Sequence, residues 1–296
     1  MKLAFLGLGA IGRPMAAHLA RSHSLVVWNR TAARATELAG AHPARAARTP
    51  RETVAGAEVV LTCLPTSAEV EKLLDGPDGI LAGLAPGALF LDCTSGDPES
   101  AQRIGVRLAA AGVAFADCPV SGGTNGAEAG TLTVMVGADP ATFARALPIL
   151  ACFGKRIEHL GPVGAGDALK AVNNALLAAH ILAFGEGFVA LAKAGVPAKK
   201  ALEVLNASSG RSFVSEGLVP DRVLTGAYPK TFRLALLDKD IGIAVRFFES
   251  QGVAAPLLSK ASQLMHEARA SLGEGADYLE AIRLHGERAG VAIRAS

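Results

Sequence analysis

One lysine stands inside an apolar stretch that has the spacing of a buried helix. Residues 168–177 read ALKAVNNALL, in which Lys170, Asn173 and Asn174 are the polar members. A buried ammonium group is costly unless it is paired or takes part in chemistry. On a helix, Lys170 and Asn174 project from one face because they are four residues apart. Lys170 could therefore exchange a proton with a carbonyl or hydroxyl oxygen, with Asn174 holding that oxygen or the lysine itself.

The same lysine could instead begin a helix and reach solvent. The segment HLGPVGAG at 159–166 precedes it and reads as a joint between two domains. If the helix starts at this joint, we expect the face of Lys170 to look into the cleft between the domains. Spacing alone leaves both interpretations open.

The N-terminal segment FLGLGAIG, residues 5–12, has the pattern G-x-G-x-x-G directly after a predicted strand and at the start of a predicted helix. In that context the glycines permit a tight turn, close approach of the backbone to a pyrophosphate, and close packing of helix on strand. The helix N-terminus then faces the negative charge. We expect these residues to contact a dinucleotide: Gly7, Gly9, Ala10, Ile11 and Gly12.

The second predicted strand ends in Asn29, Arg30 and Thr31. An NAD enzyme usually places a carboxylate there to bind the ribose 2′-hydroxyl group. Here no carboxylate would repel a 2′-phosphate, and a guanidinium group can pair with one. The sequence predicts a preference for NADP, with NAD possible, unless Arg30 is only a surface cation.

Two further segments could bind or act on a ligand. Ser121, Gly122 and Gly123 follow a predicted strand, where ligands of parallel sheets bind, and adjacent glycines can turn backbone N–H groups toward a carboxylate. The alternative is an ordinary tight turn. Lys239, flanked by Asp238 and Asp240 in an apolar helical pattern, is either on a solvated face or a second cation in the cleft.

The hydrophobic pattern predicts an α/β fold, a Rossmann-type parallel sheet followed by an all-α domain. Apolar runs predict strands at 2–7, 24–29, 58–64, 88–93, 113–118 and 132–137, with helices at 11–22 and 31–41. After residue 161 the periodicity predicts helices at 167–194, 197–206, 213–224, 233–250, 256–272 and 277–288. The expected domains are 1–162, which binds the cofactor, and 163–296, which binds substrate and dimerises.

Composition narrows the possible partners. Half of the 296 residues are hydrophobic and the formal net charge is +2, which favours neither a nucleic acid nor a membrane surface as partner. The four cysteines form no CxxC pair and do not cluster with histidines, so we expect free thiols and no metal site. The longest apolar stretch, 175–184, looks too short to span a bilayer, and we expect a soluble cytoplasmic protein.

Together these motifs resemble the β-hydroxyacid dehydrogenase family, most closely its 3-hydroxyisobutyrate dehydrogenase branch. The resemblance covers residues 1–288 and rests on seven blocks. They are FLGLGAIG, CLP at 63–65, DCTSGDP at 92–98, DCPVSGGTNGAEAGTLTVMVG at 117–137, GPVGAGDALKAVNN at 161–174, NASSGRS at 206–212 and LLDKDIGIA at 236–244.

The resemblance implies a role for each matching position. Lys170 resembles the catalytic lysine and Asn174 its amide partner at the substrate. The segment 121–123 matches the loop that binds the substrate carboxylate. Four positions match cofactor contacts of the family: Leu64, Pro65, Ser95 and, near the nicotinamide end, Lys239. The family fold is a Rossmann domain followed by a helical domain, commonly assembled as homodimers or homotetramers.

The sequence departs from the family pattern in two places. Cys118 stands where alanine is common and Ile11 where methionine is common, and we expect neither change to affect function. The segment NASSGRS resembles the hydroxyisobutyrate branch and favours that substrate over tartronate semialdehyde. Phe213 and Val214 follow where that branch varies, so the size of the substrate stays open.

The leading prediction is an NADP-dependent dehydrogenase that interconverts a short 3-hydroxy acid and its semialdehyde, most closely 3-hydroxyisobutyrate and methylmalonate semialdehyde. A succinic, glyoxylic or tartronate semialdehyde reductase is the alternative enzyme. Imine reductases generally lack the lysine, and 6-phosphogluconate dehydrogenase has a larger helical domain and a His-Asn pair where this chain has Asn173 and Asn174. A non-catalytic NADP-binding protein would have lost Lys170.

Overall fold

The computed structural model describes residues 1–295, and the chain divides into two compact units, Met1–Ala171 and Val172–Ser296. The domain boundary placed after residue 162 from the sequence stays a prediction. The strands are β1 (Lys2–Leu6), β2 (Ser24–Trp28), β3 (Ala44–Ala46), β4 (Val59–Thr62), β5 (Leu89–Asp92), β6 (Ala114–Asp117), β7 (Val120–Ser121), β8 (Leu132–Gly137) and β9 (Gly154–Gly161).

Helices of the first unit connect these strands. They are α1 (Gly12–Ala20), α2 (Ala32–Ala41), α3 (Pro50–Val54), α4 (Ser67–Leu74), α5 (Pro98–Ala110), α6 (Gly123–Ala129) and α7 (Pro140–Leu150). The helix α8 (Ala165–Lys193) begins in the first unit and continues into the second. It is followed by α9 (Ala198–Asn206), the π-helix η1 (Val214–Val223), α10 (Leu234–Ser250), α11 (Pro256–Leu272) and α12 (Glu280–Ala289).

A mostly parallel sheet forms the centre of the first unit. Its strand order is β3-β2-β1-β4-β5-β6-β8-β7, with β9 paired to β8. The first six strands in this order pair in parallel, which is the arrangement of a Rossmann fold. The predicted fold class, a Rossmann-type domain followed by an all-α domain, is confirmed.

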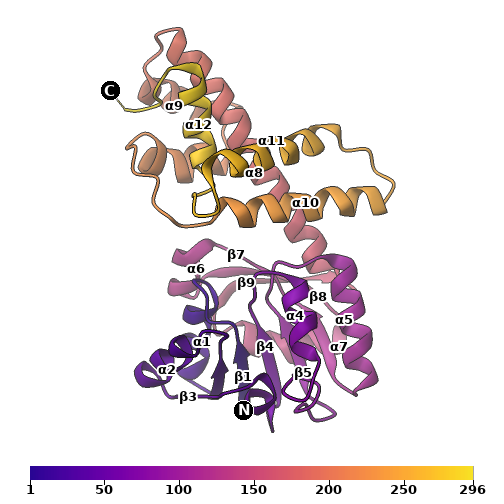
Figure 1. The fold of residues 1–296 in the computed structure, drawn as a ribbon. Coiled ribbons are helices and arrows are strands. Elements are labelled where there is room, and N and C mark those ends of the chain that lie inside the picture. The colour runs from indigo at the N-terminus through magenta and orange to yellow at the C-terminus, as the bar shows by residue number, and fades with distance from the viewer. Residues whose placement is uncertain (296) are drawn as a thin grey trace. The chain divides into compact units, whose positions relative to one another are not determined.

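The two faces of the sheet carry separate hydrophobic cores because side chains alternate along each strand. Leu3 and Phe5 of β1 pack with residues of α1, α2, α6 and α7 on one face. Ala4 and Leu6 pack with residues of α3, α4 and α5 on the other. Figure 1 shows these strands and helices in the indigo to magenta part of the chain.

The structure differs from the sequence prediction at the far end of the sheet. The run 132–137 forms β8 as predicted, but β8 pairs antiparallel with β6 and β7. The segment between β7 and β8 contains only the short helix α6, and a parallel connection needs about a dozen residues or more. The short strands β3 and β7 and the polar strand β9 were not predicted, because none of them is an apolar run.

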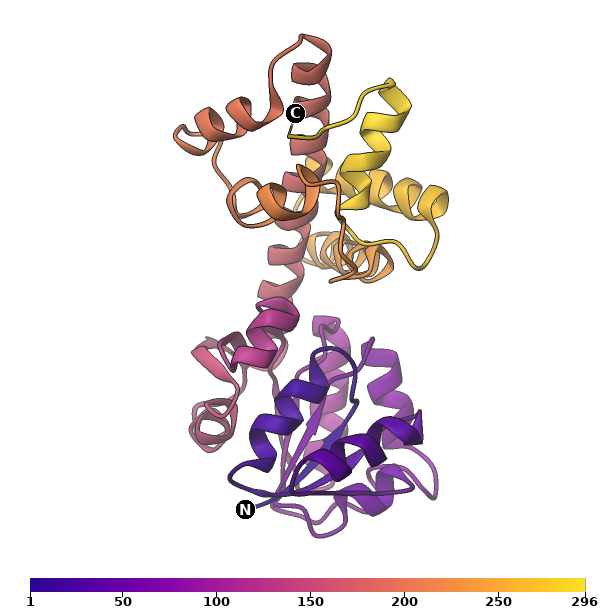
Figure 2. The same ribbon diagram turned by 90° about the vertical axis from the view of Figure 1, so that its left-hand side faces the viewer.

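The second unit is helical, and each segment predicted to be helical after residue 161 contains a helix. Phe184 and Phe188 of α8 are buried and stacked with ring centroids 3.9 Å apart. In Figure 2 the orange to yellow helices of this unit lie around the later turns of α8. The segment predicted as an ordinary helix at 213–224 is the π-helix η1, in which Pro220 has no N–H to donate to a regular α-helical ladder.

The length of α8 corrects one expectation. Within residues 1–295, this is the one helix that is long and apolar enough to cross a membrane, with a mean hydropathy of 1.8 over its most apolar window. Residues 175–184 led to the prediction that no stretch is long enough to span a bilayer. That prediction is wrong, because α8 meets the requirements of length and composition. Core helices outside membranes pass the same test, so α8 is weak evidence for a membrane span.

Candidate active site

The glycine-rich turn between β1 and α1 is shaped by two close approaches. Gly7 has a φ of +104°, and a Cβ atom there would lie 2.3 Å from the Cys63 carbonyl oxygen. A Cβ at Gly12 would lie 2.0 Å from the Gly7 carbonyl oxygen. Neither position can carry a side chain without movement of the backbone. These two glycines therefore fix the turn and the start of α1.

Gly9 is different, because a Cβ atom there would meet no protein atom within 4 Å. The fold itself does not require a glycine at this position. The missing side chain instead leaves the backbone open to close approach by a ligand. The first turn of α1 has no acidic side chain, and Ile11 provides no side-chain cap. Backbone N–H groups at such a helix start favour an anion. The loop thus fits the pyrophosphate of a dinucleotide cofactor.

Asn29 supports this loop from the end of β2. Its Oδ1 atom accepts a hydrogen bond from the Leu8 amide at 2.9 Å, and its Nδ2 donates to the Thr31 carbonyl oxygen at 3.1 Å. Arg30, next to it, has an 84% exposed side chain whose Nη1 lies 3.0 Å from Glu69 Oε1. Arg30 is therefore exposed at this edge of the sheet and forms an ion pair with Glu69.

The turns after β4 and β5 hold the other predicted cofactor contacts. Leu64 lies against Gly7 and donates its amide N–H to Thr94 Oγ1 at 3.0 Å. Thr94 directly precedes Ser95, while Pro65 follows Leu64. The structure thus brings the residues predicted at 7, 64, 65 and 95 to neighbouring turns at one edge of the sheet.

The turn at Ser121 leads into α6. Gly122 and Gly123 both have positive φ values, +136° and +63°, and Ser121 pairs with Thr133 of β8. Successive backbone N–H groups at such a turn can form a concave site for an anion. At the other end of α6, His18 Nε2 lies 3.0 Å from the Glu128 carbonyl oxygen, which ties the helix to α1.

Lys170 lies on the second turn of α8 and is 9% exposed. Three residues earlier on the same helix, Asp167 is 2% exposed, and Asp117 at the end of β6 is fully buried. Burial raises the pKa of Asp117 to about 6, although hydrogen bonds from backbone N–H groups, those of Gly164 and Asp167 foremost, oppose the shift. Asp117 and Asp167 were not among the predicted site residues, although both stand in the blocks that carry the family resemblance.

Asn174 follows Lys170 by one turn of α8 and is fixed by hydrogen bonds. Its Nδ2 donates to Asp240 Oδ2 at 2.6 Å, and its Oδ1 accepts from Asn173 Nδ2 at 3.0 Å. Asp240 Oδ1 lies 2.8 Å from Lys239 Nζ. Asp240 therefore links Asn174 to Lys239, a role that the sequence analysis missed. An acidic residue beside Lys239 in an apolar helix was the available signal.

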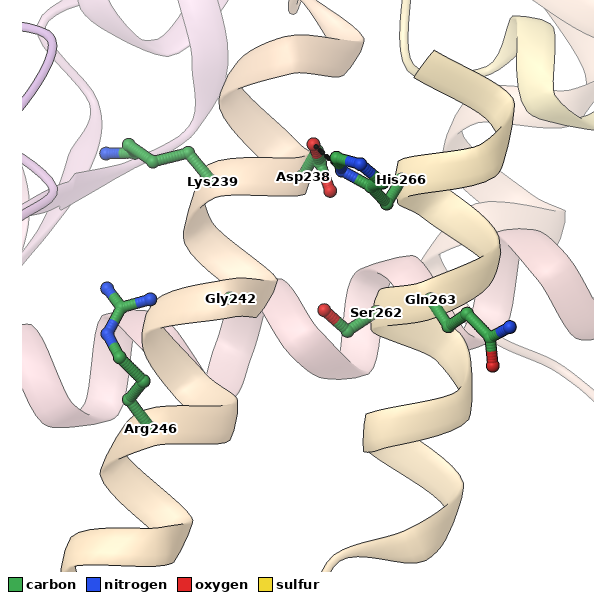
Figure 3. A pocket seen from close by; sticks show the side chains of 7 residues that line it. All are labelled: Asp238, Lys239, Gly242, Arg246, Ser262, Gln263 and His266. Atoms are coloured by element: carbon green, nitrogen blue, oxygen red, sulfur yellow. Dashed lines mark hydrogen bonds and ion pairs between the residues drawn. The ribbon is translucent and has the colours of Figure 1, made fainter. Parts of the chain in front are cut away.

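A pocket of about 440 Å³ lies beside Lys239 between α10 and α11 (Figure 3). Asp238 points toward His266, whose Nδ1 is 3.2 Å from Asp238 Oδ2, and Arg269 approaches the same oxygen at 3.0 Å. Lys239 and Arg246 extend from the opposite side of α10. Asp238 thus joins the two helices, whereas Lys239 and Arg246 present positive charge to the surroundings of α10.

The cysteines give no sign of chemistry. All four are free thiols; burial raises the pKa of Cys63 to about 12 and raises the pKa values of Cys93 and Cys118 well above the ordinary value of a thiol. Such thiols stay protonated and are poor nucleophiles. Among residues 1–295, no group of three or more His, Cys, Asp or Glu side chains is arranged to hold a metal ion.

Comparison with known proteins agrees with this geometry over nearly the whole chain. Residues 2–161 match the family described as the NAD binding domain of 6-phosphogluconate dehydrogenase. Residues 164–285 match the family described as NAD-binding of NADP-dependent 3-hydroxyisobutyrate dehydrogenase. The chain belongs to the β-hydroxyacid dehydrogenase family. It is an NAD(P)-dependent 3-hydroxyacid dehydrogenase of the 3-hydroxyisobutyrate dehydrogenase type.

Three relatives illustrate the similarity. The 2-(hydroxymethyl)glutarate dehydrogenase of Eubacterium barkeri is 35% identical over 95% of this chain and 93% of its own. The NAD-dependent L-serine dehydrogenase of Pseudomonas aeruginosa is 37% identical over 89% and 90%. The structure of Mycobacterium tuberculosis 3-hydroxyisobutyrate dehydrogenase with L-serine has a TM-score of 0.87 and 33% identity, covering 96% of this chain and 98% of that one.

The contrast between Gly9 and Gly12 gives a test of the cofactor loop. Gly9→Ala should leave the melting temperature unchanged, because its methyl group meets no protein atom, yet weaken cofactor binding roughly tenfold or more. Gly12→Ala should lower the free energy of unfolding by about 1–3 kcal/mol, because its methyl group overlaps the backbone. Thermal unfolding and quenching of the single tryptophan, Trp28, by NADPH measure both effects. Wild-type affinity in Gly9→Ala would contradict this role of Gly9.

The raised pKa of Asp117 predicts how stability depends on pH. Between its ordinary value of 3.8 and about 6, the folded protein holds a proton that the unfolded chain has lost. The contribution of Asp117 to the free energy of unfolding therefore falls as pH rises through this window, by up to about 3 kcal/mol. Urea unfolding of the wild type and of Asp117→Asn at several pH values isolates this contribution. A wild-type advantage that grows with pH would contradict it.

Proposed function

We propose that the protein interconverts 3-hydroxyisobutyrate and methylmalonate semialdehyde, or a close analogue of this pair, with NADP as the preferred cofactor. The observation that carries the proposal is the buried Lys170 on the second turn of α8, followed one turn later by the hydrogen-bonded Asn174. Proton transfer suits an ammonium group at the buried start of this helix, because the polar side chains on the neighbouring turns, Asp167 and Asn174, are fixed by hydrogen bonds.

Each residue has a separate task in this proposal. A bound nicotinamide supplies the acceptor or donor of hydride. In the oxidation direction Lys170 takes the hydroxyl proton, and in the reduction direction it returns that proton to the carbonyl oxygen. Asn174 orients the same oxygen, and Asp240 in turn orients Asn174. Ser121 and the N–H groups of Gly122 and Gly123 hold the substrate carboxylate.

The substrates named for the relatives point to a narrow chemical class of substrate for this chain. 2-(Hydroxymethyl)glutarate and L-serine each carry a hydroxymethyl group on the carbon that bears a carboxylate. 3-Hydroxyisobutyrate has the same arrangement and differs only in the third substituent. We therefore place the substrate of this chain among 2-substituted 3-hydroxypropanoates.

Assembly and location complete the proposal. We propose a cytoplasmic homodimer or homotetramer. Leu169 and Leu176, seven residues apart on α8, are 43% and 48% exposed, and this apolar stripe would be covered in an oligomer.

The substitution Lys170→Ala tests the proposed chemistry. We expect kcat to fall by about 10²–10⁴-fold, the usual contribution of a general acid–base group. The matched control is Lys193→Ala, which removes an exposed lysine from the last turn of the same helix and should keep wild-type kcat. Turnover of Lys170→Ala at the wild-type rate on every substrate would contradict the mechanism.

The assay uses 3-hydroxyisobutyrate, L-serine and 2-(hydroxymethyl)glutarate in the oxidation direction. Succinic, glyoxylic and tartronate semialdehydes are tested in the reduction direction, and each compound is tested with NADP and NAD. The highest kcat/KM on 3-hydroxyisobutyrate supports the proposal, and a higher value for one of these semialdehydes selects the alternative reductase.

Arg30 tests the cofactor preference. Arg30→Ala should raise the KM for NADP roughly ten- to hundredfold, because a charge-assisted hydrogen bond to the 2′-phosphate is lost, and leave the KM for NAD unchanged. Glu69→Ala is the informative companion, because it removes the partner of Arg30 and should lower the KM for NADP or leave it unchanged. An equal rise for both cofactors in Arg30→Ala would argue against recognition of the 2′-phosphate.

A further inference from the structure

Asp117 holds the first turn of α8 with both of its carboxylate oxygens. Oδ1 accepts a hydrogen bond from the Gly164 amide at 2.7 Å, and Oδ2 accepts one from the Asp167 amide at 2.9 Å. The carboxylate stands at the end of β6, four residues before Ser121. One buried side chain therefore connects the strand that leads to the Ser121 turn with the start of the helix that carries Lys170.

Asp167 extends this connection to a second strand end. Its Oδ1 atom accepts a hydrogen bond from the Gly96 amide at 2.9 Å, and Gly96 directly follows Ser95 in the turn after β5. Asp117 and Asp167 thus tie the first turn of α8 to the turns after β6 and β5. We call these two side chains the carboxylate clamp.

Glycines enclose the clamp tightly. A Cβ atom at Gly137 would lie 2.4 Å from Asp117 Oδ1, and one at Gly166 would lie 2.8 Å from Asp117 Oδ2. A Cβ atom at Gly96 would lie 2.7 Å from Asp167 Oδ2. Side chains at these positions would displace the carboxylates, so the surroundings leave the clamp little room to shift.

Stability alone does not account for this arrangement. Removing two carboxylates from water is costly, and burial makes the charged form of Asp117 less favourable than in the unfolded chain. An apolar contact could join the same elements without that cost. Hydrogen bonds to backbone N–H groups are directional. The clamp therefore fixes the rotation of the first turn of α8 about the helix axis and its position relative to the sheet, and Lys170 follows this turn.

We propose that Asp117 and Asp167 are positioning residues for Lys170, setting the place of its ammonium group by fixing the first turn of α8. The inference rests on the proposed function, in which Lys170 exchanges the substrate proton. Lys170 is three residues beyond Asp167, so a rotation or shift of the first turn moves its side chain directly. Displacement of a catalytic group by about 1 Å can cost on the order of 10²-fold in rate.

The experiment measures kcat and KM with 3-hydroxyisobutyrate and L-serine at saturating cofactor. Asp117→Asn replaces one accepting oxygen by a donor facing a backbone N–H, and should lower kcat by about 10²-fold while the KM for cofactor changes less than about twofold. Asp167→Ala should lower kcat similarly. Asp167→Asn should restore much of the activity, because its amide oxygen can still accept from Gly96.

Asp139→Asn is the matched control. Asp139 also accepts two backbone N–H bonds at a helix start in the first unit, and both donors, Ala141 and Thr142, belong to α7. The Asp139→Asn variant should lower the free energy of unfolding and keep the wild-type kcat. Circular dichroism and cofactor titration establish that each variant is folded; if Asp117→Asn does not fold, the two Asp167 variants decide the matter.

Three results would overturn the inference, and they are distinguishable. Wild-type kcat in folded Asp167→Ala, together with an inactive Lys170→Ala, would remove the positioning role and leave the proposed function standing. Wild-type kcat in Lys170→Ala would remove the proposed function and the positioning role with it. A loss of activity in Asp167→Ala that Asp167→Asn does not relieve would also count against the hydrogen bond as the cause.

Discussion

Four neighbouring parallel strands of this protein end in one row, and the candidate site depends on that register. Leu6 of β1 pairs with Thr62 of β4, Thr62 with Asp92 of β5, and Asp92 with Asp117 of β6. The segments that follow these residues therefore leave the sheet at the same edge. Residues as far apart in sequence as 7, 64, 95 and 121 are brought to that edge by the backbone hydrogen bonds of the sheet.

Buried polar groups then connect the turns at this edge. Thr62 donates to Asp92, and Thr94 accepts from the amide of Leu64, so the turns after β4 and β5 are held together. Asn29 holds the glycine loop through Leu8, and His18 holds the far end of α6. A polar group buried without a hydrogen-bond partner is costly. Each of these hydrogen bonds therefore also fixes the positions of the two groups that it joins.

The helix α8 combines two demands that normally conflict. Its apolar residues build the core of the second unit, while Asp167, Lys170 and Asn174 put polar groups at its beginning. The polar groups occupy successive turns, and Asp167 and Asn174 each have partners from other elements, Gly96 and Asp240. A long helix is a suitable carrier for the proton transfer that we propose for Lys170, because the orientation of the helix is set by many contacts.

The amino-acid sequence by itself determined the fold class, the helices after residue 161 and the family. These features rest on local patterns, namely apolar periodicity, glycine spacing and short motifs, which need no knowledge of distant contacts. Only the tertiary structure decided that β8 runs antiparallel to β6 and that Asp240 links Asn174 to Lys239. It also decided that Asp117 accepts a hydrogen bond from the first turn of α8. Each of these joins residues far apart in the chain through strand pairing or a side-chain bond, and a sequence pattern carries no record of which distant group will stand within hydrogen-bonding distance.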